Sequence, residues 1–202
     1  MIRAQSGTRS VADDAAIIEE SWLDPECFAV VFDRHAPCIH RYLARRVGHQ
    51  AADDLVAETF LAAFGRRRRY DPAFRDARPW LYGIATNLIG QHRREESRRY
   101  QIRLAARPEP DLPGHADRVA ADVTAQSARA LLAAALANLA EGDRDVLLLI
   151  AWEQLTYDEV ARALGVPVGT VRSRLNRART RIRDSLTSTG PASIVKEILN
   201  ND

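Results

Sequence analysis

The chain has 202 residues, and its 29 basic and 27 acidic side chains give a formal net charge of +2. This length fits one ordinary domain or two small ones, and an apolar content of 46% excludes a wholly disordered chain. No run of about 18 apolar residues is present, so a membrane-spanning helix is excluded. The first residues lack the basic-then-apolar pattern of a secretion signal. We therefore expect a cytoplasmic protein with no membrane insertion.

Positive charge is concentrated in two blocks of the sequence. Residues 28–100 hold 14 arginines against eight acids, and residues 127–187 hold nine against seven, whereas residues 1–27 hold two against six. All the basic residues except Lys196 are arginine, whose planar guanidinium suits phosphates and base edges. Two basic blocks separated by a near-neutral stretch predict two contacts with a polyanion.

The apolar residues recur with helical spacing almost everywhere, which predicts an all-α protein. Asp24 followed by Pro25 predicts a helix start, and that helix would run to Gly48. Further helices are predicted over about 51–69, where Pro72 ends the pattern, and over about 77–99. Residues 104–118 contain three prolines and a glycine and predict a linker. Helices resume at about 124–139 and 144–153.

These elements predict two small helical domains joined by a flexible, proline-rich linker. The expected parts are an acidic extension (1–24), a first domain (25–100), the linker (101–126), a second domain (127–187) and a tail (188–202).

The second domain ends in a predicted helix-turn-helix. Thr156 and Glu159 form a capping-box pattern that opens a short helix, and Gly165-Val166-Pro167 supplies the turn before a helix over about 168–186. That last helix carries six arginines between positions 172 and 183 with no acid among them. An ordinary surface helix mixes charge signs, so we favour contact with DNA over a merely solvated helix.

A helix in the major groove places its N-terminal residues against base edges and its flanking cations against phosphates. Its apolar residues would pack inward: Val171, Leu175, Ala178 and Ile182. Arg177 suits a guanine and Asn176 an adenine. The predicted DNA contacts are Thr170, Arg172, Ser173, Asn176, Arg177 and Arg179.

The helix over 51–69 has two contrasting faces. Val56, Phe60, Ala63 and Phe64 form the apolar face that would pack inward, and the opposite face is acidic and partly apolar. That second face carries Asp54, Glu58 and Leu61, with Leu55 at its edge. Periodicity alone leaves open whether it docks on a protein or is an ordinary exposed side.

Arginines alternate with aromatic residues over 66–94, the combination that unstacked bases require. Gly83 and Gly90 lie seven positions apart in the predicted third helix. Either a nucleic-acid backbone or a neighbouring helix would approach them closely, and the sequence leaves both open.

No pattern indicates an enzyme such as a nuclease. No nucleophile–base pair or phosphate-cradling loop stands out, and the five histidines show no metal-ligand spacing: His35, His40, His49, His92 and His115. We treat the spacing of His49 and Asp53 as chance. Cys27 and Cys38 are too few for a disulfide framework or a zinc site. We expect no catalytic residue, no cofactor and no metal.

Three segments together resemble the extracytoplasmic-function (ECF) sigma factors of bacterial RNA polymerase. DDLVAETFLAAF at 53–64 is similar to their polymerase-docking helix, and RPWLYGIATN at 78–87 to their promoter-melting segment. GVPVGTVRSRLNRARTRIR at 165–183 is similar to their helix-turn-helix.

The resemblance implies partners and roles for particular residues. The clamp helices of the largest polymerase subunit would meet Asp53, Asp54, Leu55, Glu58 and Leu61, and the second domain would meet the flap of the second-largest subunit. Single-stranded −10 promoter DNA would meet Arg69, Tyr70, Phe74, Arg75, Arg78, Trp80 and Asn87, with a flipped base captured by the loop over about 70–78. Duplex −35 DNA would meet the six residues of the last helix given above.

Many members of the family are held inactive by an anti-sigma factor, and the sequence leaves open whether this chain is. The alternative is a stand-alone helix-turn-helix regulator, which would leave the arginine–aromatic segment without a role.

Limited proteolysis should cut the free protein first between Leu104 and Arg118 and release two folded pieces, because prolines and exposed backbone deny this stretch a packed core. Mass spectrometry of the early fragments checks this. A first cut inside 144–183 would show that the domain boundary is misplaced.

Overall fold

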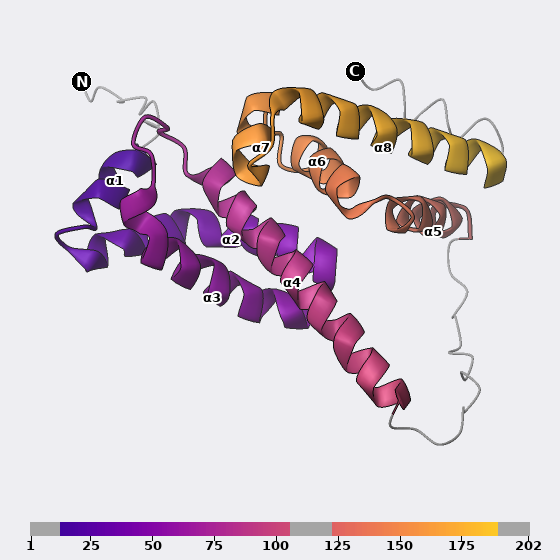
Figure 1. The fold of residues 1–202 in the computed structure, drawn as a ribbon, viewed down its shortest axis with the longest axis horizontal. Helices are drawn as coiled ribbons and strands as arrows, with labels where there is room; N and C mark the ends of the chain where they lie inside the picture. Colours follow the sequence, from indigo (N-terminus) through magenta and orange to yellow (C-terminus); the bar gives the residue numbers. More distant parts are fainter. Residues whose placement is uncertain (1–12, 106–122, 190–202) are drawn as a thin grey trace, which may run out of the picture. The chain divides into compact units, whose positions relative to one another are not determined.

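The computed structural model describes residues 13–105 and 123–189, which form helices and connecting loops with no strand among them. The expected all-α fold is confirmed. The chain divides into two compact units between Arg93 and Arg94, inside helix α4 (Arg78–Ala105). Each unit is described by itself (Figure 1).

The described part of the first unit contains one short α-helix, two long ones, two 3₁₀ turns and the start of α4. In chain order these are α1 (Asp14–Glu20), a 3₁₀ turn (Pro25–Phe28), α2 (Ala29–Val47), α3 (His49–Arg66) and a second 3₁₀ turn (Arg67–Arg69). Asp24 is a cap as predicted, since its carboxylate accepts a hydrogen bond from the Glu26 N–H, but it caps the first 3₁₀ turn, and the α-helix itself begins at Ala29. Gly48, at φ +85°, permits the tight connection between α2 and α3.

Aromatic side chains fill the space between these helices. The rings of Phe28 and Phe64 meet edge to face, with centroids 5.4 Å apart. Tyr42 of α2 packs against Tyr82 of α4 at 5.3 Å, and its hydroxyl lies 2.9 Å from the Thr86 hydroxyl. Tyr82, Thr86, Gly83 and Gly90 are all buried. This burial favours helix packing, the second of the two alternatives for the glycines.

Helix α1 is an element that the sequence analysis missed, because residues 1–24 were treated as a mere extension. Asp13 caps the helix by accepting from the Ala15 N–H at 3.1 Å, and Ile18 is fully buried. The local signals were present in the sequence: an aspartate at the cap position followed by apolar residues three apart, Ala15 and Ile18.

The second unit consists of the remainder of α4 with α5 (Val123–Ala137), α6 (Glu141–Ala151), α7 (Tyr157–Leu164) and α8 (Val168–Thr189). Both halves of the predicted capping box at Thr156 and Glu159 are present, and Gly165 ends α7 at φ +63°. Arg144 donates to the carbonyls of Leu136 and Ala137 at the C-terminal end of α5, and to the carbonyl of Leu139 just after it.

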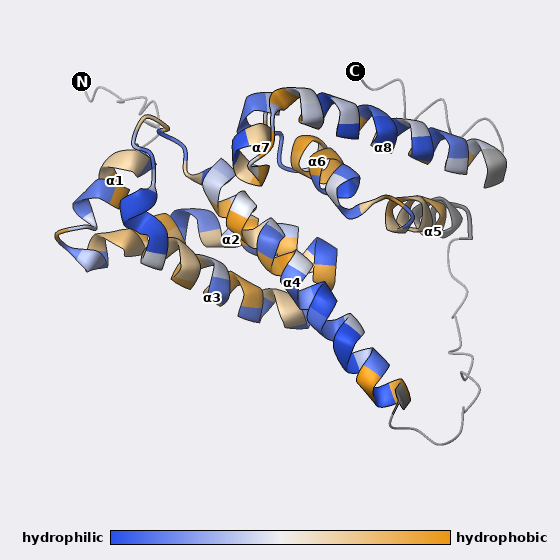
Figure 2. Cartoon of the chain, viewed as in Figure 1, coloured by the Kyte–Doolittle hydropathy of each residue, from blue (hydrophilic) through white to orange (hydrophobic). Residues whose placement is uncertain are grey.

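The helices on both sides extend further into the predicted linker than expected. Helix α4 continues to Ala105, not Arg99, because Gln101–Ala105 contains good helix formers. Figure 2 shows that α4 changes from mixed hydrophobic colouring to mainly hydrophilic along its length. Helix α5 already begins at Val123. The rest of the linker, most of the predicted cleavage stretch and most of the tail lie outside the described residues.

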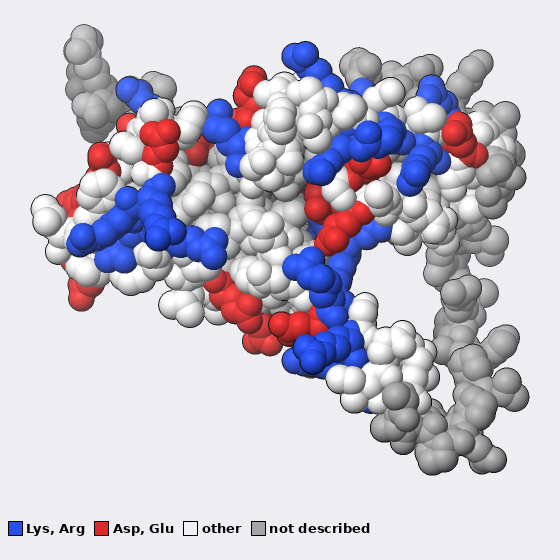
Figure 3. All heavy atoms as spheres, viewed as in Figure 1, with Lys and Arg blue, Asp and Glu red and all other residues white. Residues whose placement is uncertain are grey.

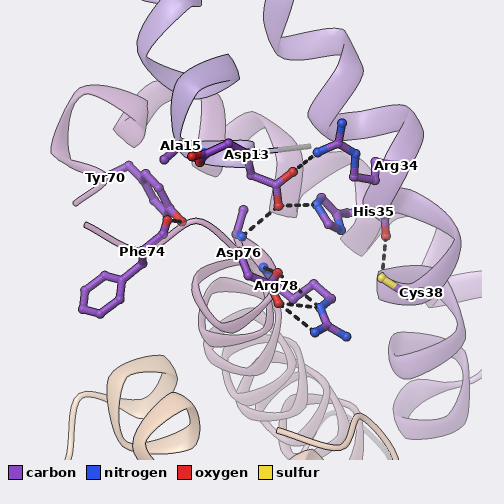
Figure 4. A network of polar contacts seen from close by, with 11 residues as sticks. Asp13, Ala15, Arg34, His35, Cys38, Tyr70, Phe74, Asp76 and Arg78 are labelled. Atoms are coloured by element: carbon purple, nitrogen blue, oxygen red, sulfur yellow. Dashed lines mark hydrogen bonds and ion pairs between the residues drawn. The ribbon is translucent and has the colours of Figure 1, made fainter. Parts of the chain in front are cut away.

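A buried polar network joins α1, α2 and the loop before α4 (Figure 4). Asp14 Oδ2 accepts from the Ala77 N–H at 2.9 Å and lies 2.9 Å from His35 Nε2, while Oδ1 accepts from the Arg34 guanidinium. Burial by itself would lower the pKa of His35, but the hydrogen bond and charge of Asp14 outweigh it and raise that pKa to about 9. Burial likewise opposes ionisation of Asp14, but its partners hold its pKa below the usual value.

The stability of the protein should therefore depend on pH. A histidine with a raised pKa stabilises the fold fully below its unfolded pKa, about 6.5, and this stabilisation is lost as the pH rises through about 9. The thermal midpoint should fall between pH 6.5 and 9, by about 4–8 °C for each kcal/mol lost. The variant His35→Gln should flatten this fall, whereas the control variant His49→Gln, at an exposed histidine, should keep it. An equally steep fall in His35→Gln would contradict the assignment.

Candidate docking face and nucleic-acid interfaces

Helix α3 presents an acidic and apolar face to solvent. Asp54, Glu58 and Leu61 lie at positions i, i+4 and i+7 and are exposed, Leu61 to 72%. Figure 3 shows the acidic side chains gathered along this helix. Leu55 is only 4% exposed and packs in the core, so the structure does not place it on this face. Asp53 is exposed and its Oδ1 lies 2.9 Å from His40 Nε2. We call Asp54, Glu58 and Leu61 the α3 face.

Four consecutive arginines begin at the last residue of α3 and continue through the 3₁₀ turn after it: Arg66, Arg67, Arg68 and Arg69. Figure 3 shows a basic area at this end of α3. Arg66 and Arg69 are exposed, but the other two also hold the fold together. The Arg67 guanidinium lies over the Phe64 ring and donates to the Phe64 and Ser21 carbonyls, and Arg68 donates to the Trp22 carbonyl. Arg69, the member predicted to meet DNA, keeps an exposed side chain.

Residues 70–77, which we call the capture loop, are braced from within. We expected Tyr70 to offer a free stacking surface, but it is 7% exposed and its ring packs 4.9 Å from that of Trp80. Its hydroxyl donates to the Phe74 carbonyl at 2.6 Å. Tyr70 therefore supports the loop and is not a platform for a base. Phe74 is half-exposed, and Figure 4 shows its ring pointing away from the buried network.

The capture loop also carries charge at its outer side. Arg75 is 84% exposed at its side chain, with Asp13 3.6 Å away. Asp76 accepts from the Arg78 N–H at 2.9 Å and pairs with the Arg78 guanidinium at 2.7 Å, which fixes the start of α4. Further along α4 Asn87 is exposed, and Trp80 is half-buried against Tyr70.

The last helix, α8, separates its two faces as expected. Val171, Leu175 and Ala178 are buried, and Ile182 is half-buried. The outward face leaves most of the predicted DNA contacts in solvent: Arg172, Ser173, Asn176, Arg177 and Arg179. Thr170 is half-buried, and its carbonyl accepts from the Ser173 hydroxyl at 3.0 Å.

Arg177 has a structural partner that the sequence analysis did not foresee. Its Nε and Nη2 donate to the two carboxylate oxygens of Asp143 in α6, at 3.2 and 2.8 Å. The Asp143 side chain is 5% exposed, and its hydrogen bond and charge raise the pKa of Arg177. This pair uses the guanidinium edge that a bidentate contact with guanine needs. Base reading by Arg177 stays a prediction. Arg172 and Asn176 are also exposed, and they are the better candidates because the Arg177 guanidinium is already paired with Asp143.

Neither a metal site nor a membrane-spanning helix is found among the described residues. No group of three or more His, Cys, Asp or Glu side chains is arranged to hold a metal ion there. Within the same part of the chain, none of the helices has the length and apolar character needed to cross a membrane.

Two family models match the chain in the order of its two basic blocks. Sigma-70 region 2 matches residues 31–99 and Sigma-70 region 4 matches residues 129–182. The first match covers α2, α3 and most of α4, and the second covers the helix-turn-helix.

The curated relatives that the chain resembles are RNA polymerase sigma factors. The chain is 36% identical over 165 residues to the ECF RNA polymerase sigma factor SigE of Mycolicibacterium smegmatis, covering 76% of this chain and 59% of that relative. It is 36% identical over 147 residues to ECF sigma factor SigC of Mycobacterium tuberculosis (70% and 73%). It is 33% identical over 162 residues to sigma factor CarQ of Myxococcus xanthus (80% and 90%).

Two solved structures share the fold. One is the sigma factor RpoE in complex with the anti-sigma factor NepR from Bartonella quintana, with a TM-score of 0.58, 23% identity, and 80% of this chain and 98% of that one covered. The other is CnrH in complex with the cytosolic domain of CnrY, with a TM-score of 0.62, 24% identity, and coverages of 89% and 99%.

The chain therefore belongs to the ECF sigma factors of RNA polymerase. The expected function, an alternative sigma factor that directs promoter-specific transcription, is confirmed, and the reading as a stand-alone regulator is not favoured.

Substitutions in α8 should distinguish the residues that contact bases from Arg177, which is paired with Asp143. In the holoenzyme, Asn176→Ala and Arg172→Ala should each cost about 1–3 kcal/mol on the cognate −35 sequence and relax preference at one base pair. Arg177→Ala should lower the thermal midpoint of the chain, because it leaves the buried Asp143 carboxylate without its cation. Competition binding over −35 variants and thermal melts measure these effects. A specificity change in Arg177→Ala without loss of stability would assign Arg177 to base reading after all.

Proposed function

We propose that this sigma factor docks on core polymerase through the α3 face and opens the −10 element by capturing an unstacked base on the capture loop. One observation carries the second part: the loop is braced internally by the Tyr70 hydroxyl and still leaves Phe74 half-exposed beside the exposed Arg75. A fixed aromatic ring with a cation next to it combines stacking with phosphate neutralisation, the two requirements of single-stranded binding.

The energies of this step are closely balanced. Stacking on an aromatic side chain is worth about 1–3 kcal/mol per base, and taking a base out of the duplex costs a similar few kcal/mol. The protein therefore opens the promoter by binding the melted state better than the duplex, which shifts the equilibrium without any bond-breaking step. In this proposal the chain contributes binding and no catalysis, in the cytoplasm, where polymerase and DNA meet.

The remaining contacts follow from the same arrangement. The clamp helices of the largest subunit are the proposed partner of the α3 face, whose two carboxylates and one exposed leucine offer charge and apolar area together. The second unit is proposed to read the −35 element with the outward face of α8 and to contact the flap of the second-largest subunit. Asn87, exposed on α4, is the proposed neighbour of the captured base.

Charge reversal on the α3 face should abolish docking. The double variant Asp54→Arg, Glu58→Arg should no longer co-purify with core polymerase, because like charges would meet and complementarity would be lost. The control Glu26→Arg, Asp33→Arg makes the same change of charge at exposed positions in the same unit and should still bind. Unchanged co-purification of the first variant would refute the assignment of the α3 face.

Removing the Phe74 ring should impair melting alone. Phe74→Ala should leave polymerase docking and −35 binding intact, while permanganate reactivity of −10 thymines falls about tenfold or more, the factor that 1.4 kcal/mol represents. A pre-melted bubble template should restore part of the loss, since the cost of opening the duplex is then already met.

The control Leu23→Ala removes a highly exposed apolar side chain outside the loop and should melt promoters normally. If Phe74→Ala melts linear promoters as well as the unchanged protein, the loop is only a connector.

A further inference from the structure

Helix α1 is attached to both ends of the segment that carries the capture loop. At the C-terminal end of the loop, the Asp14 N–H donates to the Arg75 carbonyl at 3.0 Å, and the Asp14 carboxylate accepts from the Ala77 N–H at 2.9 Å. Before the loop, Arg67 donates to the Ser21 carbonyl at 3.2 Å, and the Trp22 indole N–H donates to the Arg67 carbonyl at 3.3 Å. One short helix and the two residues after it therefore fix where the loop leaves and rejoins the fold.

The same carboxylate also connects the loop to the core of the unit. Asp14 is 3% exposed, and its oxygens meet His35 and Arg34 of α2 as well as the Ala77 amide. His35 is itself buried, and its carbonyl accepts from the Cys38 thiol at 3.0 Å. A buried carboxylate with several donors is held in one geometry, because any displacement leaves a charge or a polar group unpaired. Figure 4 shows the donors converging from separate parts of the chain.

We propose that α1 is the positioning element of the capture loop, and that Asp14 sets the direction in which Phe74 and Arg75 face the −10 strand. This inference rests on the proposed capture of a base by that loop. Asp14 itself is buried and touches no DNA; it acts through the Arg75 carbonyl and the Ala77 amide, one and three residues after Phe74. In this proposal, α1 and the two residues after it become part of promoter recognition.

The hydrogen bonds inside the loop join its own residues to one another. Within it, Tyr70 holds the Phe74 carbonyl, and Asp71 accepts from the Ala73 N–H at 3.0 Å. Phe74 and Arg75, two of the residues expected to meet DNA, lie between that local turn and the attachment at Ala77. Without the attachment of Ala77 to Asp14, the loop should keep its local turn but vary in its orientation relative to the rest of the unit. A base would then stack less well on the displaced Phe74 ring.

The test compares Asp14→Asn with Glu19→Gln, which removes the same charge from the exposed side of the same helix. Each full-length variant is assembled with core polymerase, its active fraction is titrated, and open complexes are measured on the cognate promoter and on single-base variants of the −10 element. A loss of folded protein lowers opening on all these promoters alike. A misdirected loop instead reduces the ratio between cognate and variant promoters, so this ratio is the decisive measurement.

We expect Asp14→Asn to reduce that ratio about fivefold to tenfold, with −35 binding and core binding unchanged, and Glu19→Gln to leave it unaltered. Exchange of the Ala77 amide with deuterium should also become faster in Asp14→Asn. Should Asp14→Asn fold too poorly to assemble, Arg34→Gln carries the test, because it weakens the same network from a side chain that is 31% exposed. The expected direction is the same.

The outcomes separate this inference from the function on which it rests. If Phe74→Ala impairs melting but Asp14→Asn and Arg34→Gln behave like Glu19→Gln, α1 has no positioning role and the inference is overturned alone. If Phe74→Ala is also without effect, base capture by the loop is refuted and the inference falls with it. A reduced ratio in Asp14→Asn together with impaired melting in Phe74→Ala supports both.

Discussion

The carboxylate of Asp14 is the interaction on which the arrangement of the first unit depends. It lies at the first turn of α1, receives a backbone N–H from the start of α4 and meets two basic side chains of α2. Burying a carboxylate is costly unless it is paired and hydrogen-bonded. This cost makes the geometry around Asp14 specific, because a carboxylate with these donors has few alternative positions. Asp14 thereby holds three segments that are distant in sequence, namely α1, α2 and the loop before α4, in fixed positions relative to one another.

A second buried carboxylate has a comparable role in the other unit. Asp143 lies in the first turn of α6 and holds Arg177 of α8 through two hydrogen bonds. The contact also brings α8 close to the start of α6, where a Cβ on Gly142 would lie 2.9 Å from Arg174 Nη1. In both units, a carboxylate near a helix start fixes an element proposed to meet DNA: the capture loop in one and the outward face of α8 in the other. Orientation of a nucleic-acid contact thus depends on residues that do not touch the nucleic acid.

The distinction between exposed contact residues and the buried residues that orient them explains which site residues could be predicted from the sequence. Asp54, Glu58 and Leu61 follow from helical spacing alone, because an amphipathic helix has only one way to place them. The outward residues of α8 follow in the same way from the spacing of Val171, Leu175 and Ala178. Leu55 and Tyr70 were misjudged because each lies at the edge of a face or in a loop, where tertiary neighbours decide burial. The Trp80 ring packs against the Tyr70 ring, and no local sequence pattern predicts that contact.

The sequence by itself determined the helices from α2 onward, the order of the two basic blocks and the helix-turn-helix, since these depend on local spacing, capping and turn residues. It also contained the family resemblance that the comparisons confirmed. Only the tertiary structure decided that α1 belongs to the first unit, that Asp14 joins it to His35 and Ala77, and that Arg177 is paired with Asp143. The physical reason is that an ion pair between residues 21 or 34 positions apart has no periodic signature. Its partners are selected by the packing of whole helices.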